Sequence, residues 1–238
     1  MPSPDSSVPS HRARRPRLDG DEVWIFDLDN TLYPASCGLF PQIDRRMGEF
    51  IEGFLSLGRD EARRLQKRYF QEHGTTLRGL MLNHALRAQD YLDFVHAVDL
   101  SAIAPSAALD AALESLPGRK LVFTNASTAH AERVLTRLGI ARHFQAVFDI
   151  AAADYRPKPM AEPYHRLVAR HAIEPQRAVF FEDSARNLEP AAALGMTTVL
   201  VAAADEPTGD AVADFVHHVT ADLAGWLRSL VTAPAKGG

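Results

Sequence analysis

The stretch Val23-Trp24-Ile25-Phe26-Asp27-Leu28-Asp29-Asn30-Thr31 gives the strongest indication of the fold. Its first four residues are large and apolar, as in a short strand that is buried on both faces of a sheet. The polar residues that follow at once place Asp27 and Asp29 just beyond the carboxyl end of that strand. The sequence therefore predicts a buried strand that delivers two carboxylates at its end.

Two further apolar runs end in the same way. Residues 120–123 are followed by Thr124-Asn125, and residues 178–181 are followed by Glu182-Asp183. The carboxyl ends of parallel strands meet at one edge of a sheet, and ligands of such folds bind beyond that edge. The three polar clusters are therefore expected to lie close together.

Two more candidate strands, at 146–148 and 197–201, each follow a helix-like segment that closes with a glycine, Gly139 or Gly195. Strands and helices thus alternate through the C-terminal half of the chain. This alternation predicts an α/β fold in which a Rossmann-like parallel sheet carries helices on both faces, with right-handed crossovers between the strands.

The region from Leu39 to about Leu100 has a different pattern, because large apolar residues recur there at helical spacing without a strand between them. Helical stretches are predicted at the start of this region, at Arg59 to His73 and at Leu77 to Val98, and the glycines within it mark breaks or tight contacts. The sequence predicts an all-helical insert between the first and second strands of the sheet.

The predicted organisation has four parts. Residues 1–20 form a disordered tail with four arginines and almost no large apolar side chains, although an Arg- and Ser-rich start also resembles a transit peptide. Residues 21–38 and 101–232 form the α/β core, residues 39–100 form the helical insert, and residues 233–238 form a frayed tail.

Composition and charge narrow the class of protein. Of 238 residues, 46% are hydrophobic and 24% are charged, which is ordinary for a globular chain, and a net charge of −4 supplies no basic field for a nucleic acid polymer. No apolar run is long enough to span a bilayer, so no membrane partner is expected. A single cysteine, Cys37, excludes an internal disulfide and favours the cytoplasm. The pattern does not indicate an oligomeric state.

The acidic residues predict a metal. Asp27 and Asp29 lie two apart, and two adjacent carboxylates repel unless a cation, a shared proton or a strong donor lies nearby. Mg²⁺ meets this need because it prefers oxygen ligands and binds through one or two carboxylates. An Asp-rich turn is the alternative for this pair, and a helix N-cap is the alternative for Asp183. The second acidic pair, Glu182-Asp183, brings four carboxylates to one edge and favours Mg²⁺.

Two other polar residues fit a phosphate. Thr124 and the backbone amides after it could face a phosphate at a helix N-terminus, with a simple hydroxyl cap as the alternative. Lys158 lies between Pro157 and Pro159, so it is a cation on a stiff turn. Placed against the carboxylates, it would restrain a nucleophile and offset charge on a transferring phosphoryl group, whereas alone it would be read as a surface lysine.

Together, Asp27-x-Asp29-x-Thr31, Thr124, Lys158 and Glu182-Asp183 resemble the four motifs of the haloacid dehalogenase (HAD) superfamily of phosphatases. The resemblance implies a HAD fold with an all-helical type-1 cap inserted after the first strand. It also implies that Asp27 attacks phosphorus and becomes a phospho-aspartate, while Asp29 protonates the leaving group and then activates water.

The same resemblance implies which residues bind the metal and which bind the phosphate. It implies that Mg²⁺ is held by the carboxylate of Asp27, the main-chain carbonyl of Asp29 and Asp183, with Glu182 beside it directly or through water. Thr124 and Lys158 would hold the phosphate, and Thr31 and Asn125, which belong to the first and second motifs, are further candidates for phosphate contacts.

Three longer segments, at 26–33, 73–80 and 181–188, look like the pyrimidine 5'-nucleotidase branch, which acts on nucleoside monophosphates such as UMP and CMP. Thr75 and Thr76 fall in the predicted cap and are candidates for contacts with the nucleoside, with a capped helix start as the alternative. His73 departs from the branch, where an aromatic residue precedes the glycine.

Other functions remain open to the sequence. Sugar phosphates and other small phosphomonoesters are alternative substrates, because fold and motif do not define the substrate. A catalytically silent metal-binding module is the alternative that is not an enzyme. A phospho-aspartate receiver domain is disfavoured, because such domains are about half as long and have no acid two residues after the phosphorylated aspartate.

Overall fold

The computed structural model describes residues 16, 18–202 and 213–232. Almost all of the predicted disordered tail (1–20) and all of the predicted frayed tail (233–238) lie outside these residues.

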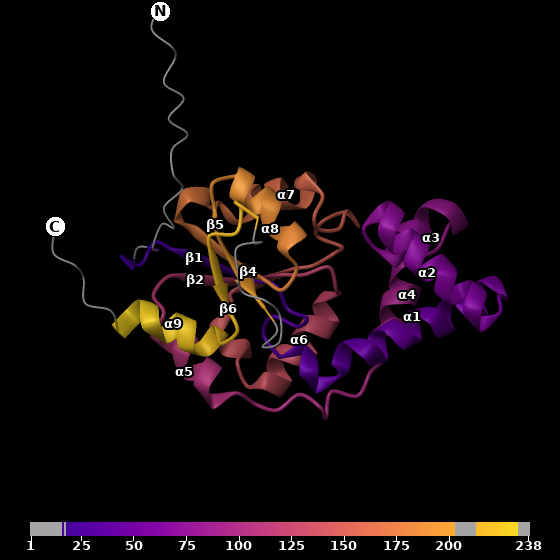
Figure 1. Cartoon of the computed structure of the whole chain (residues 1–238), viewed down its shortest axis with the longest axis horizontal. Coiled ribbons are helices and arrows are strands. Elements are labelled where there is room, and N and C mark those ends of the chain that lie inside the picture. The colour runs from indigo at the N-terminus through magenta and orange to yellow at the C-terminus, as the bar shows by residue number, and fades with distance from the viewer. Residues whose placement is uncertain (1–15, 17, 203–212, 233–238) are drawn as a thin grey trace, which may run out of the picture.

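A six-stranded parallel sheet forms the centre of the molecule (Figure 1). Its strands follow the spatial order β3-β2-β1-β4-β5-β6, so β1 lies in the middle, between β2 and β4. The strands are β1 (Val23–Phe26), β2 (Arg119–Phe123), β3 (Ala146–Phe148), β4 (Ala178–Glu182), β5 (Thr197–Val201) and β6 (His218–Thr220). The α/β parallel-sheet fold that the sequence predicts is confirmed.

Helices cover both faces of the sheet, and alternate residues of β1 serve the two faces. Trp24 and Phe26 pack with one group of helices, and Val23 and Ile25 pack with the other. The first group comprises α5 (Ala107–Ser115), α6 (Thr128–Leu138) and α9 (Leu223–Thr232), and the second comprises α7 (Ala161–His171) and α8 (Ala185–Ala193). Single-turn helices lie at Ala35–Cys37, Ala141–His143 and Pro175–Arg177.

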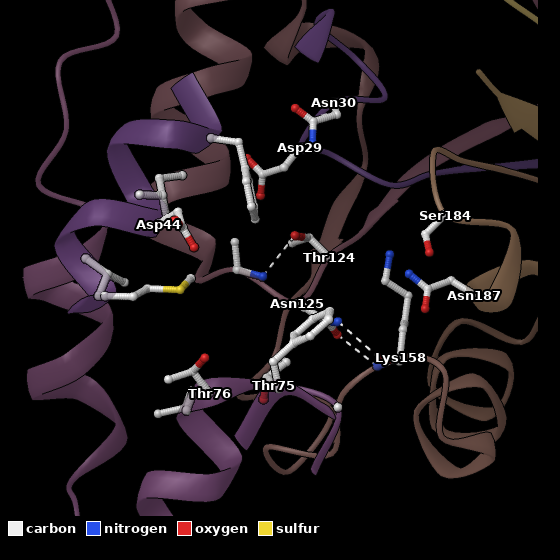
Figure 2. A pocket seen from close by; sticks show the side chains of 18 of the residues that line it. Asp29, Asn30, Asp44, Thr75, Thr76, Thr124, Asn125, Lys158, Ser184 and Asn187 are labelled. Carbon is white, nitrogen blue, oxygen red and sulfur yellow. Dashed lines mark hydrogen bonds between the residues drawn. The ribbon is translucent and has the colours of Figure 1, made fainter. Parts of the chain in front are cut away.

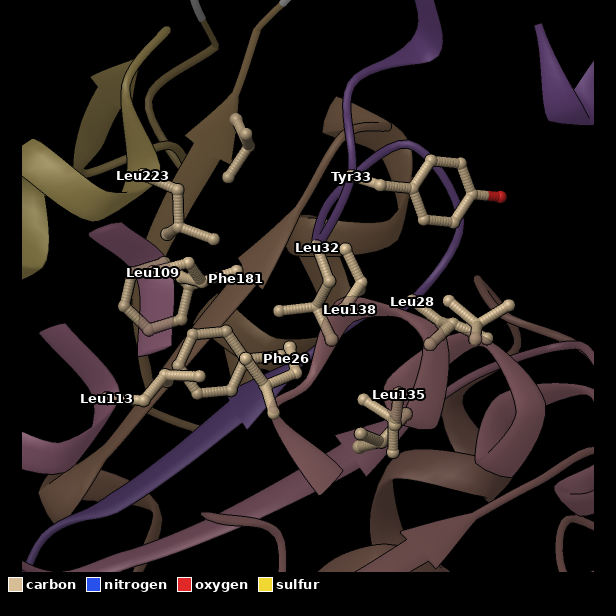
Figure 3. Packing of buried hydrophobic residues seen from close by; sticks show 14 of the residues in the cluster. Phe26, Leu28, Leu32, Tyr33, Leu109, Leu113, Leu135, Leu138, Phe181 and Leu223 are labelled. Atoms are coloured by element: carbon tan, nitrogen blue, oxygen red, sulfur yellow. The ribbon is translucent and has the colours of Figure 1, made fainter. Parts of the chain in front are cut away.

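Aromatic side chains of β1 and β4 pack in the core on one face of the sheet. The rings of Phe26 and Phe181 stack with their centres 4.6 Å apart, and leucines of α5 and α6 surround them (Figure 3). Burying each such ring contributes about 1.5–3 kcal/mol to the hydrophobic stabilisation. Because the strand is fixed by this packing on both faces, the residue that follows Phe26 is held in a defined position.

Four helices between β1 and β2 form a separate group beside the sheet (Figure 1), here called the helical insert. They are α1 (Leu39–Leu55), α2 (Arg59–His73), α3 (Thr76–His84) and α4 (Ala88–Val95). The insert has its own apolar core, which includes Ile51, Leu65, Leu80 and Leu92. The prediction of an all-helical insert after the first strand is confirmed.

Within the insert, α2 and α3 pack at very close range. A Cβ atom on Gly79 would lie only 2.4 Å from the Cγ atom of Tyr69, so a glycine is required where the two helices meet. The helical stretch predicted from Leu77 to Val98 is wrong as a single element. Ala85 has a φ of 51°, in the left-handed region, and this ends α3 before α4 begins.

The sixth strand was not predicted from the sequence. It has three half-buried residues and pairs with β5 alone, so its side chains carry no strong apolar signal. Before it, the Nδ1 atom of His217 accepts a hydrogen bond from the amide of Thr198 at 3.0 Å. Within the described ranges, no helix combines the length and apolar character that crossing a bilayer requires.

Candidate active site

Asp27 is the residue that the central strand presents at its carboxyl end. Its backbone amide donates to the carbonyl of Phe181 at 2.9 Å, which continues the β1–β4 ladder one residue past the strand. Its side chain is buried, with Oδ1 2.7 Å from the Nζ atom of Lys158. The Thr31 hydroxyl donates to Oδ2 at 3.2 Å. Both carboxylate oxygens are therefore oriented by the protein.

Lys158 is a fully enclosed cation, with 1% of its side chain exposed. Its ammonium group donates to Asp27 at 2.7 Å, to Oε2 of Glu182 at 2.6 Å and to the carbonyl of Phe123 at 2.9 Å. An ammonium group has three donors, so all of them are used. This geometry fixes the lysine between the ends of β1, β2 and β4.

Asn125 holds the backbone of Lys158 in place. The asparagine Oδ1 accepts from the Lys158 amide at 2.9 Å, and Nδ2 donates to the Lys158 carbonyl at 3.3 Å (Figure 2). The neighbouring Thr124 is buried, and its Oγ1 accepts from the amide of Ala126 at 2.9 Å. Both residues line the same cavity as Asp27. The structure thus brings Thr124 and Asn125 to the same cavity as Asp27, where Asn125 orients the backbone of Lys158.

Asp27 and Glu182 are two buried carboxylates that share the cation of Lys158, so this centre has excess negative charge. Burial, and next the charge of Glu182, raise the pKa of Asp27 to about 7. Burial likewise raises the pKa of Glu182 to about 7. Burial lowers the pKa of Lys158, but the charges of Asp27 and Glu182 outweigh it, so the net pKa lies above its usual value and the lysine stays charged.

A third carboxylate, Asp183, completes an oxygen-rich cluster. Ligand oxygens of Asp27, Glu182 and Asp183 all lie within 4.8 Å of one another. Nearby, the side-chain oxygens of Asn30 and Asn187 are buried without a hydrogen-bond partner in the described residues. Because every donor is a hard oxygen and the cluster has excess negative charge, the residues fit Mg²⁺.

Asp29 is oriented differently from its neighbours. Its Oδ1 accepts a hydrogen bond from the Tyr33 hydroxyl at 2.6 Å and contacts Nε2 of His130 at 3.1 Å. Burial raises the pKa of Asp29, but the hydrogen bonds and charge of these partners outweigh it, so the net pKa lies below its usual value. The carboxylate of Asp29 is not part of the acidic cluster that could hold a metal.

Sequence reasoning missed Tyr33, His130 and His96 as members of the site. Tyr33 is four residues after Asp29, within the segment 26–33, but nothing in the sequence marked its hydroxyl as a partner. His130 is 101 residues from Asp29 in the chain, and the histidines show no ligand spacing. The topology of the fold brings His130 and His96 to the site, whereas Tyr33 lies in the same loop as Asp29.

A cavity of about 520 Å³ lies over the acidic cluster. Figure 2 shows Asp44, Thr75 and Thr76 of the insert around the same space as side chains of the sheet edge. The insert also contributes Phe40, Met47, Gln66, Phe70 and Tyr91 to the lining. Beside the cavity the guanidinium of Arg186 in α8 lies 4.6 Å from the centre of the Phe70 ring in α2.

Three predicted substrate contacts already have partners in the protein. The Oγ1 of Thr75 accepts from the Arg78 amide at 3.3 Å and caps α3, which is the alternative considered for this residue. The Thr76 hydroxyl donates to the Gln66 carbonyl at 3.3 Å. Both threonines line the cavity, whereas Thr31 is not in its lining and bonds Asp27 instead.

The fold and the site together place the chain among α/β proteins with a Rossmann-like parallel sheet. An aspartate paired with a lysine follows the central strand of this sheet, and an acidic cluster that fits a metal lies beside it. The family model described as haloacid dehalogenase-like hydrolase matches residues 22–195. The chain belongs to this family of hydrolases.

Two curated relatives are similar over part of their length. Phosphate metabolism protein 8 of Saccharomyces cerevisiae is 28% identical over 197 residues, which cover 75% of this chain and 61% of that protein. Fructose-1-phosphate phosphatase YqaB of Escherichia coli is 32% identical over 120 residues, which cover 49% of this chain and 61% of that protein. The matches thus span 61% of the length of each relative.

Solved structures share the fold. A HAD phosphatase from Thermococcus onnurineus matches with a TM-score of 0.58 and 19% identity, over 89% of this chain and 98% of that chain. The HAD-hydrolase YfnB from Bacillus subtilis, whose structure was solved bound to magnesium, matches with a TM-score of 0.55 and 16% identity, over 90% and 99% of the two chains. At these identities the likeness supports the fold alone.

Proposed function

We propose that this protein is a Mg²⁺-dependent phosphomonoester phosphatase that works through a phospho-aspartate on Asp27. The observation that carries the proposal is the placement of Asp27, 2.7 Å from a fully buried lysine and in one oxygen cluster with Glu182 and Asp183. A buried carboxylate with these neighbours can attack phosphorus while the phosphoryl charge is neutralised around it.

In the first step, an oxygen of Asp27 forms a bond to phosphorus and the bond from phosphorus to the leaving oxygen breaks. The leaving oxygen takes a proton from Asp29, which must enter this step protonated and regains the proton from water in the second step. In the second step, Asp29 takes a proton from a water whose oxygen attacks the phospho-aspartate, and the carboxylate of Asp27 is released together with inorganic phosphate. This sequence regenerates both residues.

Other residues of the edge orient the phosphoryl group. Lys158 restrains Asp27 and offsets charge on the transferring group, and Thr124 lies at the N-terminal approach to α6, where backbone amides favour an anion. Mg²⁺ would be held by Asp27, Asp183 and the main-chain carbonyl of Asp29, with Glu182 beside it, and when bound it would supply positive charge that offsets the charge of the phosphoryl group.

We further propose that the helical insert is the cap that recognises the leaving group of the substrate. Aromatic and apolar side chains of the insert, such as Phe40, Met47 and Phe70, line one side of the cavity, and Asp44 and Gln66 supply polar groups. Such a mixture suits a flat heteroaromatic base with hydrogen-bonding edges. Closure of the insert would also exclude water from the reaction.

A pyrimidine nucleoside 5'-monophosphate, of the UMP or CMP type, is the substrate class that we propose. Support comes from the resemblance of residues 26–33, 73–80 and 181–188 to that branch, and from a cavity large enough for a nucleoside. A sugar phosphate is the alternative, favoured by the similarity to a protein named as a fructose-1-phosphate phosphatase. Since Cys37 is free, we propose the cytoplasm as the compartment.

The test is a phosphate-release screen across nucleoside monophosphates and sugar phosphates, with Mg²⁺ and with a chelator. The proposed function predicts Mg²⁺-dependent release, with UMP and CMP preferred over purine nucleotides and over fructose 1-phosphate. Preference for fructose 1-phosphate would support the alternative substrate. Binding of Mg²⁺ without release of phosphate from any ester would instead support a silent metal-binding module.

A further inference from the structure

The carboxylate of Asp29 is held through one of its two oxygens. Oδ1 receives both the Tyr33 hydroxyl at 2.6 Å and Nε2 of His130 at 3.1 Å. In the described part of the chain no hydrogen bond reaches Oδ2, and Asp29 lines the cavity over the acidic cluster. One oxygen is thus anchored in the protein while the other is available to a ligand.

The Tyr33 hydroxyl acts only as a hydrogen-bond donor to this carboxylate. Tyr33 is 2% exposed, and burial raises its pKa well above the usual value, so the hydroxyl keeps its hydrogen. The loop that carries it is fixed by the amide of Leu32, which donates to the carbonyl of Leu28 at 3.1 Å. The tyrosine therefore holds Oδ1 from the same loop that carries Asp29.

His130 approaches the same oxygen from α6. Oδ1 carries no hydrogen when Asp29 is ionised or when its proton is on Oδ2, so in both forms the Nε2 atom of His130 carries the hydrogen of this contact. Its Nδ1 atom is buried and has no partner among the described residues, so no second hydrogen bond orients the ring. Packing does so instead, because the ring stacks on His96 with centres 4.3 Å apart and an interplanar angle of 17°.

His96 connects this arrangement to the helical insert. It caps the C-terminal end of α4, where the chain returns from the insert to the core. Its Nδ1 lies 3.0 Å from Oγ of Ser127, the residue that caps α6. Arg133, also on α6, donates to the carbonyls of His96 at 2.8 Å and Val98 at 2.9 Å. The return segment of the insert is thus fastened to the helix that carries His130.

We propose that Tyr33 and His130 are positioning residues that fix Oδ1 of Asp29, so that Oδ2 faces the leaving oxygen, and that His96 links this orientation to the helical insert. The inference rests on the proposed function. It predicts that the three residues assist the step in which the bond from phosphorus to the leaving oxygen breaks and that oxygen takes the proton of Asp29.

The test compares two substrates whose leaving groups differ in their need for a proton. Nitrophenolate is stable without protonation, whereas the alkoxide of a primary alcohol is not. We would measure kcat/KM, which reports the steps up to release of the alcohol, for 4-nitrophenyl phosphate and for whichever of UMP and fructose 1-phosphate the wild type hydrolyses. A defect in proton donation slows only the alkyl ester.

For Tyr33→Phe and His130→Ala, kcat/KM for the alkyl phosphate should fall by about 10²-fold, the lower end of what general acid catalysis contributes. For 4-nitrophenyl phosphate it should change by less than about 3-fold, because that step does not draw on the general acid. His130→Gln keeps a donor near the position of Nε2 and should recover part of the loss. His96→Ala removes the stacking partner and should give a smaller selective loss.

Matched controls exist elsewhere in the fold. His143→Gln alters another buried histidine whose Nε2 contacts an aspartate, Asp110, at 2.8 Å, and Tyr69→Phe removes another bonded tyrosine hydroxyl. Neither residue lines the cavity over the acidic cluster, so neither variant should change the ratio of the two kcat/KM values.

Equal losses on both substrates for Tyr33→Phe and His130→Ala, or no loss on either, would overturn the positioning role while leaving the phosphatase intact. An unchanged ratio for His96→Ala alone would remove the link to the insert. Failure of the proposed function gives a different result, because the wild type would then release phosphate from none of the three esters.

Discussion

The Nζ atom of Lys158 lies 2.7 Å from Oδ1 of Asp27, although 131 residues separate the two in the chain. The same Nζ atom bonds Glu182, so one cation holds the ends of strands β1 and β4 together. A buried charge is costly unless it is paired, and here the pairing is also the restraint on the proposed nucleophile. The same contact therefore contributes both to the stability of the fold and to the proposed chemistry.

Lys158→Met should both destabilise the protein and stop turnover. The substitution leaves Asp27 and Glu182 buried without their cation, and breaking such a pair costs about 3–5 kcal/mol. The free energy of unfolding, from urea titration followed by circular dichroism, measures the loss. Adding Glu182→Gln to the variant should restore part of the stability, because one of the unpaired carboxylates is removed. Wild-type stability in the single variant would contradict this account of the ion pair.

Asp27→Asn should abolish phosphate release while preserving the fold. The amide cannot attack phosphorus, and loss of a nucleophile lowers kcat by about 10⁴-fold or more. Because burial and Glu182 oppose ionisation of Asp27, a neutral side chain relieves repulsion, and the melting temperature without metal should be equal to or higher than that of the wild type. Asp154→Asn, which changes an exposed aspartate, serves as the control. Retained activity in Asp27→Asn would contradict the phospho-aspartate mechanism.

Gly79→Ala tests the close packing of α2 on α3. The added Cβ would lie 2.4 Å from the Tyr69 ring, so the helices must separate, and overpacking of this kind costs about 1–3 kcal/mol. Gly53→Ala in the last turn of α1 has open space around its Cβ and should instead stabilise by up to about 0.5–1 kcal/mol, because alanine favours helical backbone more than glycine does. Chemical denaturation of both variants measures the difference, and equal effects of the two substitutions would argue against the packing constraint.

The sequence was a good guide where local pattern determines structure. The apolar runs at 23–26 and 178–181 became neighbouring strands because such runs can be satisfied only by burial on both faces. The short strand β6 was missed since it is half-buried and pairs on one side only. The break at Ala85 was missed since a left-handed alanine leaves no composition signal.

For the site, the sequence predicted the residues at strand ends but not the contacts between distant side chains. Asp27, Lys158 and Glu182 could be placed together because all of them lie at or near the carboxyl edge of one parallel sheet. The contact of His130 with Asp29 depends on how α6 is oriented relative to the carboxyl edge of the sheet, and no spacing in the sequence encodes this orientation. The side-chain partners of Thr75 and Thr76 depend in the same way on helix packing.

The effect of Mg²⁺ on stability should depend on pH. The pKa values of Asp27 and Glu182 are about 7 in the fold, above their usual values of 3.8 and 4.5. Without metal, the folded protein therefore binds protons more tightly than the unfolded chain, so the free energy of unfolding should fall as pH rises from about 4 to about 7 and then level off. Mg²⁺ competes with those protons for the same oxygens, so its stabilising effect should be small near pH 5 and large near pH 8. Thermal melts with Mg²⁺ and with chelator at both pH values measure this difference, and Asp27→Asn should flatten the pH dependence of the melts in chelator. A stabilisation by Mg²⁺ of equal size at both pH values would mean that the ion binds away from these carboxylates.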